Sequence, residues 1–177
     1  LVGPVRAIER FGSDAMKARV IPEVTAGEAT VAVSMSEPDA GTALTDLKTR
    51  AVDAGDHLLL NGTKRWTSGA GHAKYYVTYC RLSDDDGAKG IGAVLVEKGM
   101  TGVGFGAREE LMGFRGIETR DILLDDVRVP KENLVVPAGS FGKLMSAFGL
   151  ERCGNATQAL GVAAGALEQA LAYTQER

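Results

Sequence analysis

The order of hydrophobic and polar residues divides the chain into three zones. The first zone, residues 4–20, has the spacing of a helix. Gly12 interrupts it, Ser13 can serve as the N-cap of a second helical stretch, and Pro22 is expected to end that stretch. We therefore expect two short helices, followed by a loop at residues 25–29.

The second zone, from Val31 to about Val136, has the pattern of β-strands. Short runs that alternate in polarity, or that are rich in β-branched and aromatic residues, are separated by polar turns. The runs are VAVSMS (31–36), HLLLNGTKRWTS (57–68), KYYVTYC (74–80), IGAVLVE (91–97) and RDILLDDVRV (120–129). Asn61 and Gly62 divide the second run and predict a hairpin turn there. No helical pattern interrupts the strands, which favours an antiparallel barrel or sandwich over a parallel βαβ sheet.

The third zone, from Gly139 to the end, is helical. Apolar residues at spacings of four, three and four mark one face of this helix, at Leu160, Ala164, Leu167 and Leu171. Alanines make the helix slim, and glycines at 149, 154, 161 and 165 weaken it locally. We expect this face to pack closely against something outside this chain. The predicted fold class is α+β, with a central antiparallel β-barrel or sandwich flanked by helices.

Composition excludes several classes of function. Of the 177 residues, 45% are hydrophobic and 24% are charged, which is typical of a globular protein, and the net charge of −3 gives no broad attraction to nucleic acid or anionic membranes. The cysteines, Cys80 and Cys153, and the histidines, His57 and His72, lack the spacing of a disulfide framework or a metal site. We expect no metal and a reducing compartment. The first residue is Leu1 and the last residues continue a helical pattern, so we expect a piece of a longer protein.

One glycine-rich segment imitates a dinucleotide fingerprint. GVGFGA, residues 102–107, matches G-x-G-x-x-A, but that motif must follow a strand and open a helix inside a βαβ unit. The residues that follow lie in the β zone, so we interpret the segment as a plain turn. The adjacent Arg108 is a candidate phosphate contact, with a solvated surface arginine as the alternative.

Two polar segments of the β zone are candidate binding elements. In SMSEPDAGT, residues 34–42, the backbone N–H groups of the turn can form an anion- or carbonyl-binding nest, with Ser36 and Thr42 as further donors. The alternative is a simple capped turn. In NGTKRWTSGAG, residues 61–71, Trp66 beside hydroxyl groups suits a planar ring cofactor. The alternative is a tryptophan of the core.

Glu151 is the candidate general base. It lies early in the C-terminal helix among small and apolar residues, with Phe148 three residues before and Asn155 four residues after on the same side. The alternative is an ion pair. Arg152 is a poor partner for it, because adjacent helical residues do not face each other.

Together these segments resemble the acyl-CoA dehydrogenase family of flavoproteins. FGSDAMKARVIPEVTAGE resembles the end of the family's N-terminal helical domain, and MSEPDAGT resembles its T-E-P-x-A-G-S turn. LNGTKRWTSGA is similar to the N-G-x-K-x-W-I-T-N strand, and MGFRGIETRDILLDDVRVP to R-x-S-x-T followed by D-V-x-V-P. The last 27 residues resemble the first long helix of the C-terminal bundle. The resemblance implies three parts: the end of an N-terminal helical domain (1–29), a middle β-barrel domain (30–137) and the first helix of a C-terminal bundle (138–177).

The resemblance also implies FAD as the cofactor. Met35 and Ser36 would touch the pyrimidine side of the flavin, Thr42 would lie near the pyrophosphate, and Arg177 would reach the FAD of a neighbouring subunit. The implied cofactor-binding residues are Met35, Ser36, Thr42, Trp66, Thr67, Ser68 and Arg177. Trp66 would pack on the isoalloxazine ring and Ser68 would hydrogen-bond near N5. Ser36, Thr42 and Ser68 differ from the usual family residues but keep a hydroxyl group.

The implied reaction is α,β-dehydrogenation of an acyl-CoA thioester. Glu151 stands at the position of the base in the isovaleryl-CoA and long-chain enzymes, directly before the helix arginine. The implied substrate-binding residues are Thr42, Arg108, Leu150, Glu151 and Arg152. Gly149 replaces an aspartate that commonly contacts pantetheine, which puts that contact in doubt.

The family further implies partners and a location. These are electron-transfer flavoprotein as the electron acceptor, a homotetramer, and the bacterial cytoplasm, or the mitochondrial matrix in a eukaryote. Two other functions stay open: an acyl-CoA oxidase or non-dehydrogenating flavoprotein relative, and a non-catalytic barrel that binds acyl ligands.

Overall fold

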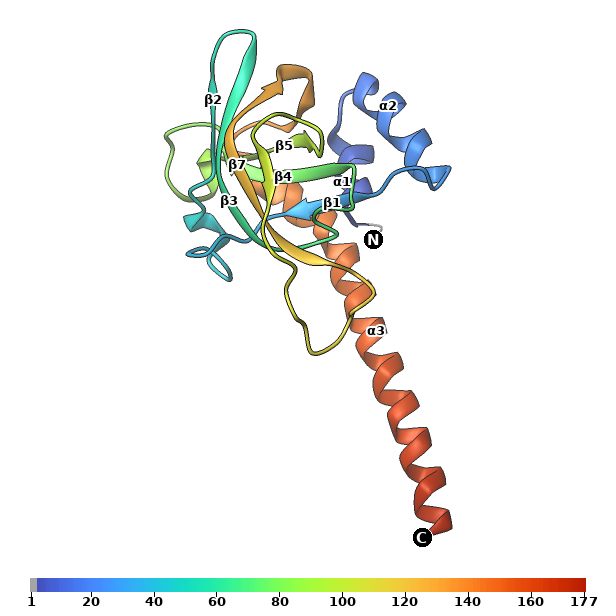
Figure 1. Cartoon of the computed structure of the whole chain (residues 1–177). Helices are drawn as coiled ribbons and strands as arrows, with labels where there is room; N and C mark the ends of the chain where they lie inside the picture. Colours follow the sequence, from blue (N-terminus) through green and yellow to red (C-terminus); the bar gives the residue numbers. More distant parts are fainter. Residues whose placement is uncertain (1–2) are drawn as a thin grey trace.

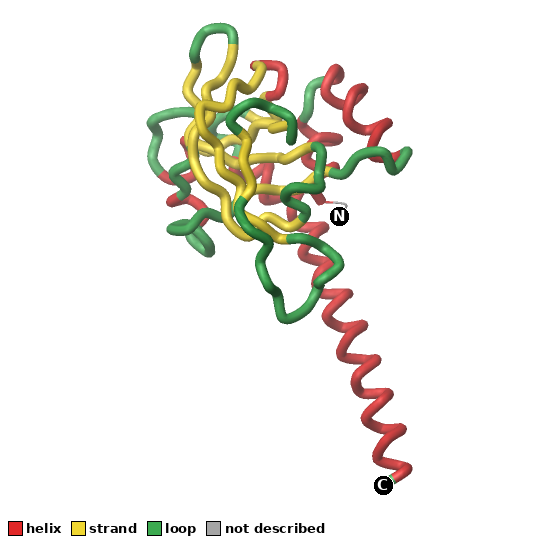
Figure 2. The backbone as a smooth tube through the Cα atoms, in the orientation of Figure 1, coloured by secondary structure: helices red, strands yellow, loops and turns green. Residues whose placement is uncertain are grey.

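The computed structural model describes residues 3–177, and its elements follow the predicted order of helix, sheet and helix. Two short helices lie against one side of a twisted sheet, and a long C-terminal helix starts on the same body and projects away from it (Figure 1). Most of the connections between strands are loops, as the tube view shows (Figure 2). No described helix has the length and apolar character needed to cross a membrane.

The two N-terminal helices are α1 (Gly3–Phe11) and α2 (Asp14–Thr25). The predicted break at Gly12 and the cap at Ser13 are confirmed, since the Ser13 side chain accepts a hydrogen bond from the Met16 N–H at 3.2 Å. The prediction that Pro22 ends the helix is wrong, because α2 continues to Thr25. A proline removes only its own N–H, and the next turn closes normally, with the Ala26 N–H donating to the Pro22 carbonyl at 2.9 Å.

Within residues 3–177, eight strands form one mixed sheet. They are β1 (Val31–Ser34), β2 (Arg50–Asp53), β3 (His57–Ser68), β4 (Tyr75–Arg81), β5 (Ile91–Glu97), β6 (Val103–Phe105), β7 (Thr119–Pro130) and β8 (Leu134–Val136). Short 3₁₀ turns lie between them, η1 (Leu44–Asp46), η2 (Gly87–Gly90) and η3 (Lys131–Asn133). The strand order is β6-β7-β3-β2-β4-β5-β8, and β1 pairs with β4.

The sheet is mostly antiparallel, as predicted, but the barrel is not closed. β1 runs parallel to β4, and β2 meets β4 in a single parallel pair. The two ends of the strand path, β6 and β8, have only three residues each and do not pair with each other among the described residues. Short edge strands offer few unpaired backbone groups, so the sheet can stay open without a long exposed edge. The three-domain division stays a prediction.

The hairpin predicted at Asn61 and Gly62 is wrong. β3 is continuous through both residues, and the turn that joins β2 to β3 is at residues 54–56, with Gly55 at φ 95°. Gly62 instead lies at a bulge with φ 149°, where an added Cβ would lie 2.8 Å from the Cα of Thr49. The glycine is therefore required by a close approach of two backbones rather than by a turn.

The sheet separates two hydrophobic cores. On one face, residues of α1, α2 and the start of α3 pack against β1, β4, β5 and β8. On the other face, β3, β7 and the opposite sides of β4 and β5 pack together. Tyr75 belongs to the first core and Tyr76 to the second, because successive side chains of a strand point to opposite faces.

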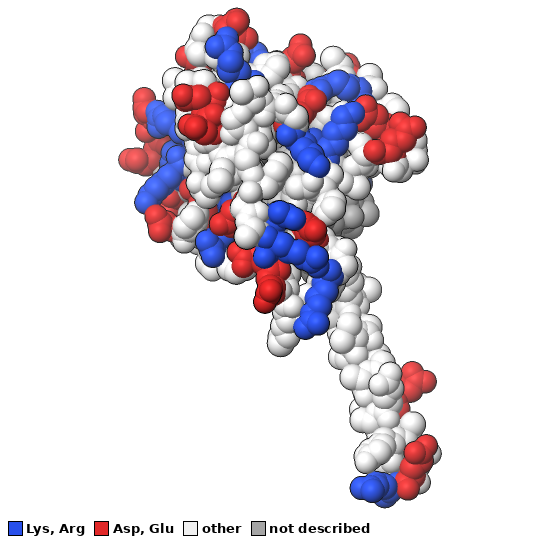
Figure 3. Space-filling model, viewed as in Figure 1, with Lys and Arg blue, Asp and Glu red and all other residues white. Residues whose placement is uncertain are grey.

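The C-terminal helix α3 (Phe141–Glu176) has two different parts. Leu144 and Ala147 are buried in the first core, whereas almost every residue beyond Glu151 is exposed. The visible side of the projecting part carries few charged side chains until near its C-terminal end (Figure 3). The start of α3 is thus anchored on the sheet, and most of its remainder is exposed within the described chain.

Candidate functional site

The end of β3 presents two predicted cofactor residues to solvent. Trp66 is 51% exposed and Ser68 is exposed, whereas Thr67 between them is buried. Trp66 has φ 59° at a bulge between Lys64 and Thr67, and such a left-handed backbone costs a bulky residue about 1–3 kcal/mol. The Arg65 guanidinium lies 4.9 Å from the centroid of the Trp66 ring. The bulge and the neighbouring guanidinium therefore accompany an indole that lies at the surface, away from the core.

The end of β3 forms one wall of the candidate site, and the segment after β1 forms a second wall beside it. The Ser36 carbonyl accepts a hydrogen bond from the Arg65 N–H at 2.8 Å, which fastens this segment beside the end of β3. Two backbone hydrogen bonds between Glu37 and Ala40, of 3.0 and 3.2 Å, close the turn that follows. The turn is therefore a folded hydrogen-bonded unit.

The third wall is the point where α3 leaves the core. Phe148, Glu151 and Asn155 recur at helical spacing on one side of α3. They line a cavity of about 220 Å³, together with Pro4, Val33, Met35, Trp66 and Ser68. Of the residues predicted from the sequence, the structure thus brings Met35, Trp66, Ser68 and Glu151 together.

A larger cavity of about 790 Å³ lies on the other side of Glu151. Ser68, Glu151 and Asn155 border both cavities. The remaining lining of the larger cavity is mostly apolar and comes from the loop after β6, from the start of β7 and from the projecting part of α3: Leu111, Phe114, Ile117, Thr119, Gln158, Ala159, Val162, Ala163 and Ala166. Glu151 is thus a carboxylate on the border between a small cavity beside an indole and a large apolar one.

The Glu151 side chain also meets the start of α1. Its Oε2 accepts a hydrogen bond from the Gly3 N–H at 3.0 Å. A Cβ atom added at Gly3 would lie 3.1 Å from the Cβ of Glu151 and closer still to its carboxylate. Position 3 therefore has no room for a side chain while the carboxylate keeps this place.

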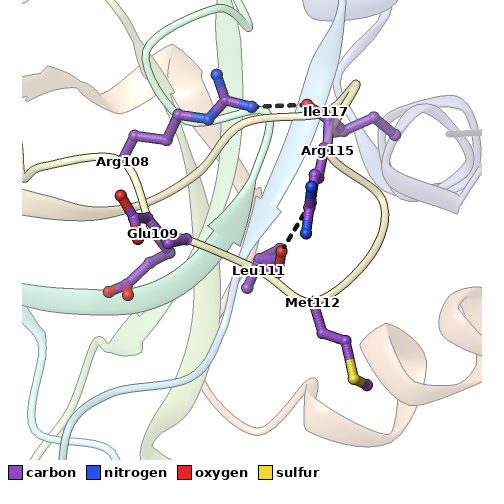
Figure 4. Close-up of a pocket in the computed structure, with 7 residues that line it drawn as sticks. Arg108, Glu109, Leu111, Met112, Arg115 and Ile117 are labelled. Atoms are coloured by element: carbon purple, nitrogen blue, oxygen red, sulfur yellow. Dashed lines mark hydrogen bonds between the residues drawn. The ribbon is translucent and has the colours of Figure 1, made fainter.

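Arg108 lies in the loop between β6 and β7. Its Nη2 donates to the Arg115 carbonyl at 2.6 Å, and the Arg115 Nε donates to the Leu111 carbonyl at 3.3 Å, so the loop is bound to itself (Figure 4). Together with Glu109, Glu110, Met112 and Ile117, these residues line a hollow of about 720 Å³. The prediction that GVGFGA is a plain turn is wrong, because β6 (Val103–Phe105) occupies the middle of this segment. The next element is β7 rather than a helix, so the segment does not have the geometry of a dinucleotide fingerprint. The role of Arg108 in binding phosphate stays a prediction.

The other predicted residues lie outside the cavities that Glu151 borders. The Thr67 hydroxyl is buried and has no hydrogen-bond partner within residues 3–177, so only its main chain could reach a ligand. Thr42 and Leu150 are exposed, and the Arg152 guanidinium lies 5.2 Å from the Phe148 ring centroid. Arg177 lies at the far end of α3, away from the sheet (Figure 1).

Sequence reasoning missed four residues that contribute to this region. Gly3 and the apolar loop residues Leu111 and Phe114 gave no signal, because their contacts join segments far apart in the chain. Lys64 gave a weak one: a lysine at an inward position of an alternating strand. No group of three metal-binding side chains occurs within residues 3–177.

Comparison with known proteins identifies the family of this chain. The profile of the family described as acyl-CoA dehydrogenase, middle domain, matches residues 32–127. The chain belongs to the acyl-CoA dehydrogenase family. Cyclohexane-1-carbonyl-CoA dehydrogenase of Syntrophus aciditrophicus is 38% identical over 160 residues, which cover 90% of this chain and 42% of that protein.

Two further similarities widen the picture of this family. The 3-sulfinopropanoyl-CoA desulfinase of Cupriavidus necator is 37% identical over 183 residues, covering 99% of this chain and 46% of that protein. The structure of a glutaryl-CoA dehydrogenase from Mycobacterium smegmatis in complex with FADH2 superposes with a TM-score of 0.89 at 29% identity, and the match covers 99% of this chain and 44% of that one. The chain thus spans less than half the length of these proteins.

Proposed function

We propose that this chain forms the central part of an FAD-dependent enzyme that dehydrogenates an acyl-CoA thioester, with Glu151 as the base. The observation that carries the proposal is the place of Glu151. Its carboxylate borders the small cavity beside Trp66 and Ser68 and also the large apolar cavity. A base for this reaction needs a redox cofactor on one side and an acyl group within reach, and the arrangement supplies room for both.

The residues of the small cavity fit a flavin. The half-exposed Trp66 indole offers a flat apolar surface, and the exposed Ser68 hydroxyl can donate to a ring heteroatom. Met35 adds an apolar contact from the opposite segment. FAD held by these residues would supply the acceptor for the β-hydrogen of the substrate, which leaves as a hydride. Ser36, Thr42, Thr67 and Arg177 are proposed as further contacts of the same cofactor.

The chain's own part in the reaction is to hold the acyl group and to take one proton. The apolar walls of the large cavity offer a surface against which the acyl chain can pack. The Glu151 carboxylate removes the α-proton and becomes the carboxylic acid. Thr42, Arg108, Leu150 and Arg152 are proposed as contacts of the CoA thioester.

Replacement of Glu151 tests the base. In a protein of the relatives' length that contains this chain, we expect Glu151→Gln to retain FAD but to slow reduction of the flavin by substrate by at least about a hundredfold, the scale of a lost general base. Stopped-flow absorbance of the flavin measures this rate. Glu168→Gln, the same change on the same helix but outside both cavities, is the control. Normal flavin reduction in Glu151→Gln would overturn the assignment of the base.

The desulfinase relative supports one alternative, a non-dehydrogenating member of the family. An acyl-CoA oxidase is the other flavoprotein alternative. Product analysis separates these functions: an α,β-unsaturated thioester formed with an external electron acceptor supports the dehydrogenase, and one formed with consumption of oxygen supports the oxidase. A full-length protein without flavin absorbance would instead support a non-catalytic module that binds acyl ligands.

The remaining features of the family belong to this proposal. We propose electron-transfer flavoprotein as the electron acceptor and a homotetramer as the assembly, in which Arg177 serves the neighbouring subunit. The proposed location is the cytoplasm of a bacterium, or the mitochondrial matrix if the source is eukaryotic.

A further inference from the structure

The side chain of Lys64 is buried although it carries an ammonium group. It extends inward from β3 two residues before Trp66, and it is 0% exposed. Its Nζ lies 2.7 Å from Oε1 of Glu37, whose side chain is 5% exposed. Burying two charges is costly, and a well-packed apolar pair of similar volume is often equally stable. Stability alone is therefore a weak explanation for this pair.

The contacts of Lys64 hold the segment after β1. Its Nζ also donates to the Met35 carbonyl at 3.1 Å, and the neighbouring Arg65 N–H donates to the Ser36 carbonyl at 2.8 Å. Two consecutive carbonyl groups of this segment thus point toward β3. Because both carbonyls are held there, the main chain of Met35 and Ser36 has little freedom to rotate.

The contacts of Glu37 fix the same segment from its other end. Its carboxylate accepts hydrogen bonds from the N–H groups of Lys48 at 2.6 Å and Thr49 at 3.0 Å, in addition to that from Lys64. Burial raises the pKa of Glu37, but the Lys64 ammonium and these hydrogen bonds outweigh it, so the pKa stays below its usual value. The carboxylate is therefore ionised and fully engaged.

Both segments that the pair joins border the small cavity. Met35 lines it from the segment after β1, and Trp66 lines it from the end of β3. Lys64 and Glu37 themselves do not line it. They therefore act on the cavity through the main chain to which they are bonded.

We infer that the buried Lys64–Glu37 pair positions the main chain of Met35 and Ser36 relative to Trp66 and thereby sets the width of the flavin site. This inference rests on the proposed function, because it takes FAD as the ligand of that cavity. Lys64 and Glu37 are positioning residues: their loss moves the walls of the site without removing a group that touches the cofactor.

The test removes both charges together. Lys64→Met alone would leave Glu37 buried without a partner and could unfold the protein. The Lys48 and Thr49 N–H groups donate to different oxygens of Glu37, so in the double variant Lys64→Met/Glu37→Gln the Gln amide oxygen can still accept from one of them. In a protein of the relatives' length, we expect this variant to fold with a somewhat lower melting temperature than the wild type and to bind FAD about tenfold more weakly. FAD titration of the apoprotein, followed by quenching of flavin fluorescence, measures the affinity.

An exposed pair on the same turn provides the control. Lys48 Nζ lies 2.9 Å from Asp39 Oδ2, and both side chains are about three-quarters exposed. Lys48→Met/Asp39→Asn makes nearly the same chemical change and should leave the affinity for FAD unchanged. Unchanged affinity in the buried double variant, with FAD bound normally by the wild type, would overturn this inference alone. A wild type that binds no FAD would overturn the proposed function as well.

Discussion

Strands β4 and β5 and the projecting part of α3 are all rich in apolar residues, yet they lie in opposite environments. Every residue of β4 from Tyr75 to Cys80 is buried, and so is every residue of β5 from Ile91 to Val96. In α3, by contrast, Leu160, Leu167 and Leu171 are more than half exposed. The strands are covered on both faces, whereas the projecting helix has no described neighbour beyond the loop at residues 106–118.

The difference shows that an apolar sequence pattern identifies the apolar face of an element but not the residues that pack against it. The strands receive their cover from helices on one side and from β3 and β7 on the other. The face of α3 has the same kind of residues, but no such layers cover it in the part of the chain that the structure describes, and contiguous exposed apolar surface is typical of an interaction site. Glu151 lies where α3 passes from one environment to the other, and there the two cavities meet.

The largest expected effect comes from the same leucine truncation in each region. Leu95 in β5 is 0% exposed and Leu160 in α3 is 71% exposed. We expect Leu95→Ala to lower the free energy of unfolding by about 2–5 kcal/mol, because it leaves a cavity in the core. Leu160→Ala should change it by about 0.5 kcal/mol or less in this chain. Urea denaturation followed by tryptophan fluorescence measures both, and equal losses would contradict the comparison.

The same contrast explains how much of the fold the sequence could predict. Strands β4 and β5 were predictable because apolar and β-branched residues dominate them. The Ser13 cap was predictable because its signal is local. The hairpin predicted at Asn61 and Gly62 was wrong because Gly62 is required by its close approach to the backbone of Thr49, which lies 13 positions before it in the chain. Barrel closure was also wrong, because it depends on pairing between β6 and β8, which no local pattern encodes.

The residues of the candidate site also divide into those that the sequence indicated and those that it did not. The structure places Met35, Trp66, Ser68 and Glu151 around one cavity. Three of them are singled out as polar or aromatic residues at unusual places and all four by the family resemblance, and their roles stay a prediction. The contacts that hold these residues in place could not be predicted from the sequence. The bond from the Gly3 N–H to Glu151 joins residues 148 positions apart, and such contacts exist only once the chain has folded.

A smaller effect is expected from a glycine in the projecting helix. Gly161 has open space where its Cβ would lie, so Gly161→Ala should stabilise α3 locally in this chain by about 0.5–1 kcal/mol. Amide hydrogen exchange of the helix measures the gain. In a protein of the relatives' length we expect a loss instead, because the slim face is then packed closely. Gly142→Ala is the control: an added Cβ also has open space at this position, but the residue lies in the first turn of α3 and not in its projecting part. Equal gains from Gly161→Ala in both proteins would contradict a packed face.

The smallest effect on stability, and the sharpest contrast between the regions, concerns the two thiols. Cys80 lies in β4 and Cys153 is exposed on α3. Burial raises the pKa of Cys80 to about 12, so near pH 8 this group stays a thiol, and it is also out of reach of a reagent. We expect one thiol of the folded chain to react readily with a disulfide reagent and the second to react only in denaturant. Cys153→Ser should abolish the fast reaction and leave the free energy of unfolding unchanged. If both thiols of the wild type reacted at similar rates, β4 would open more easily than its complete burial implies, and the contrast between strand and helix would fail where it is strongest.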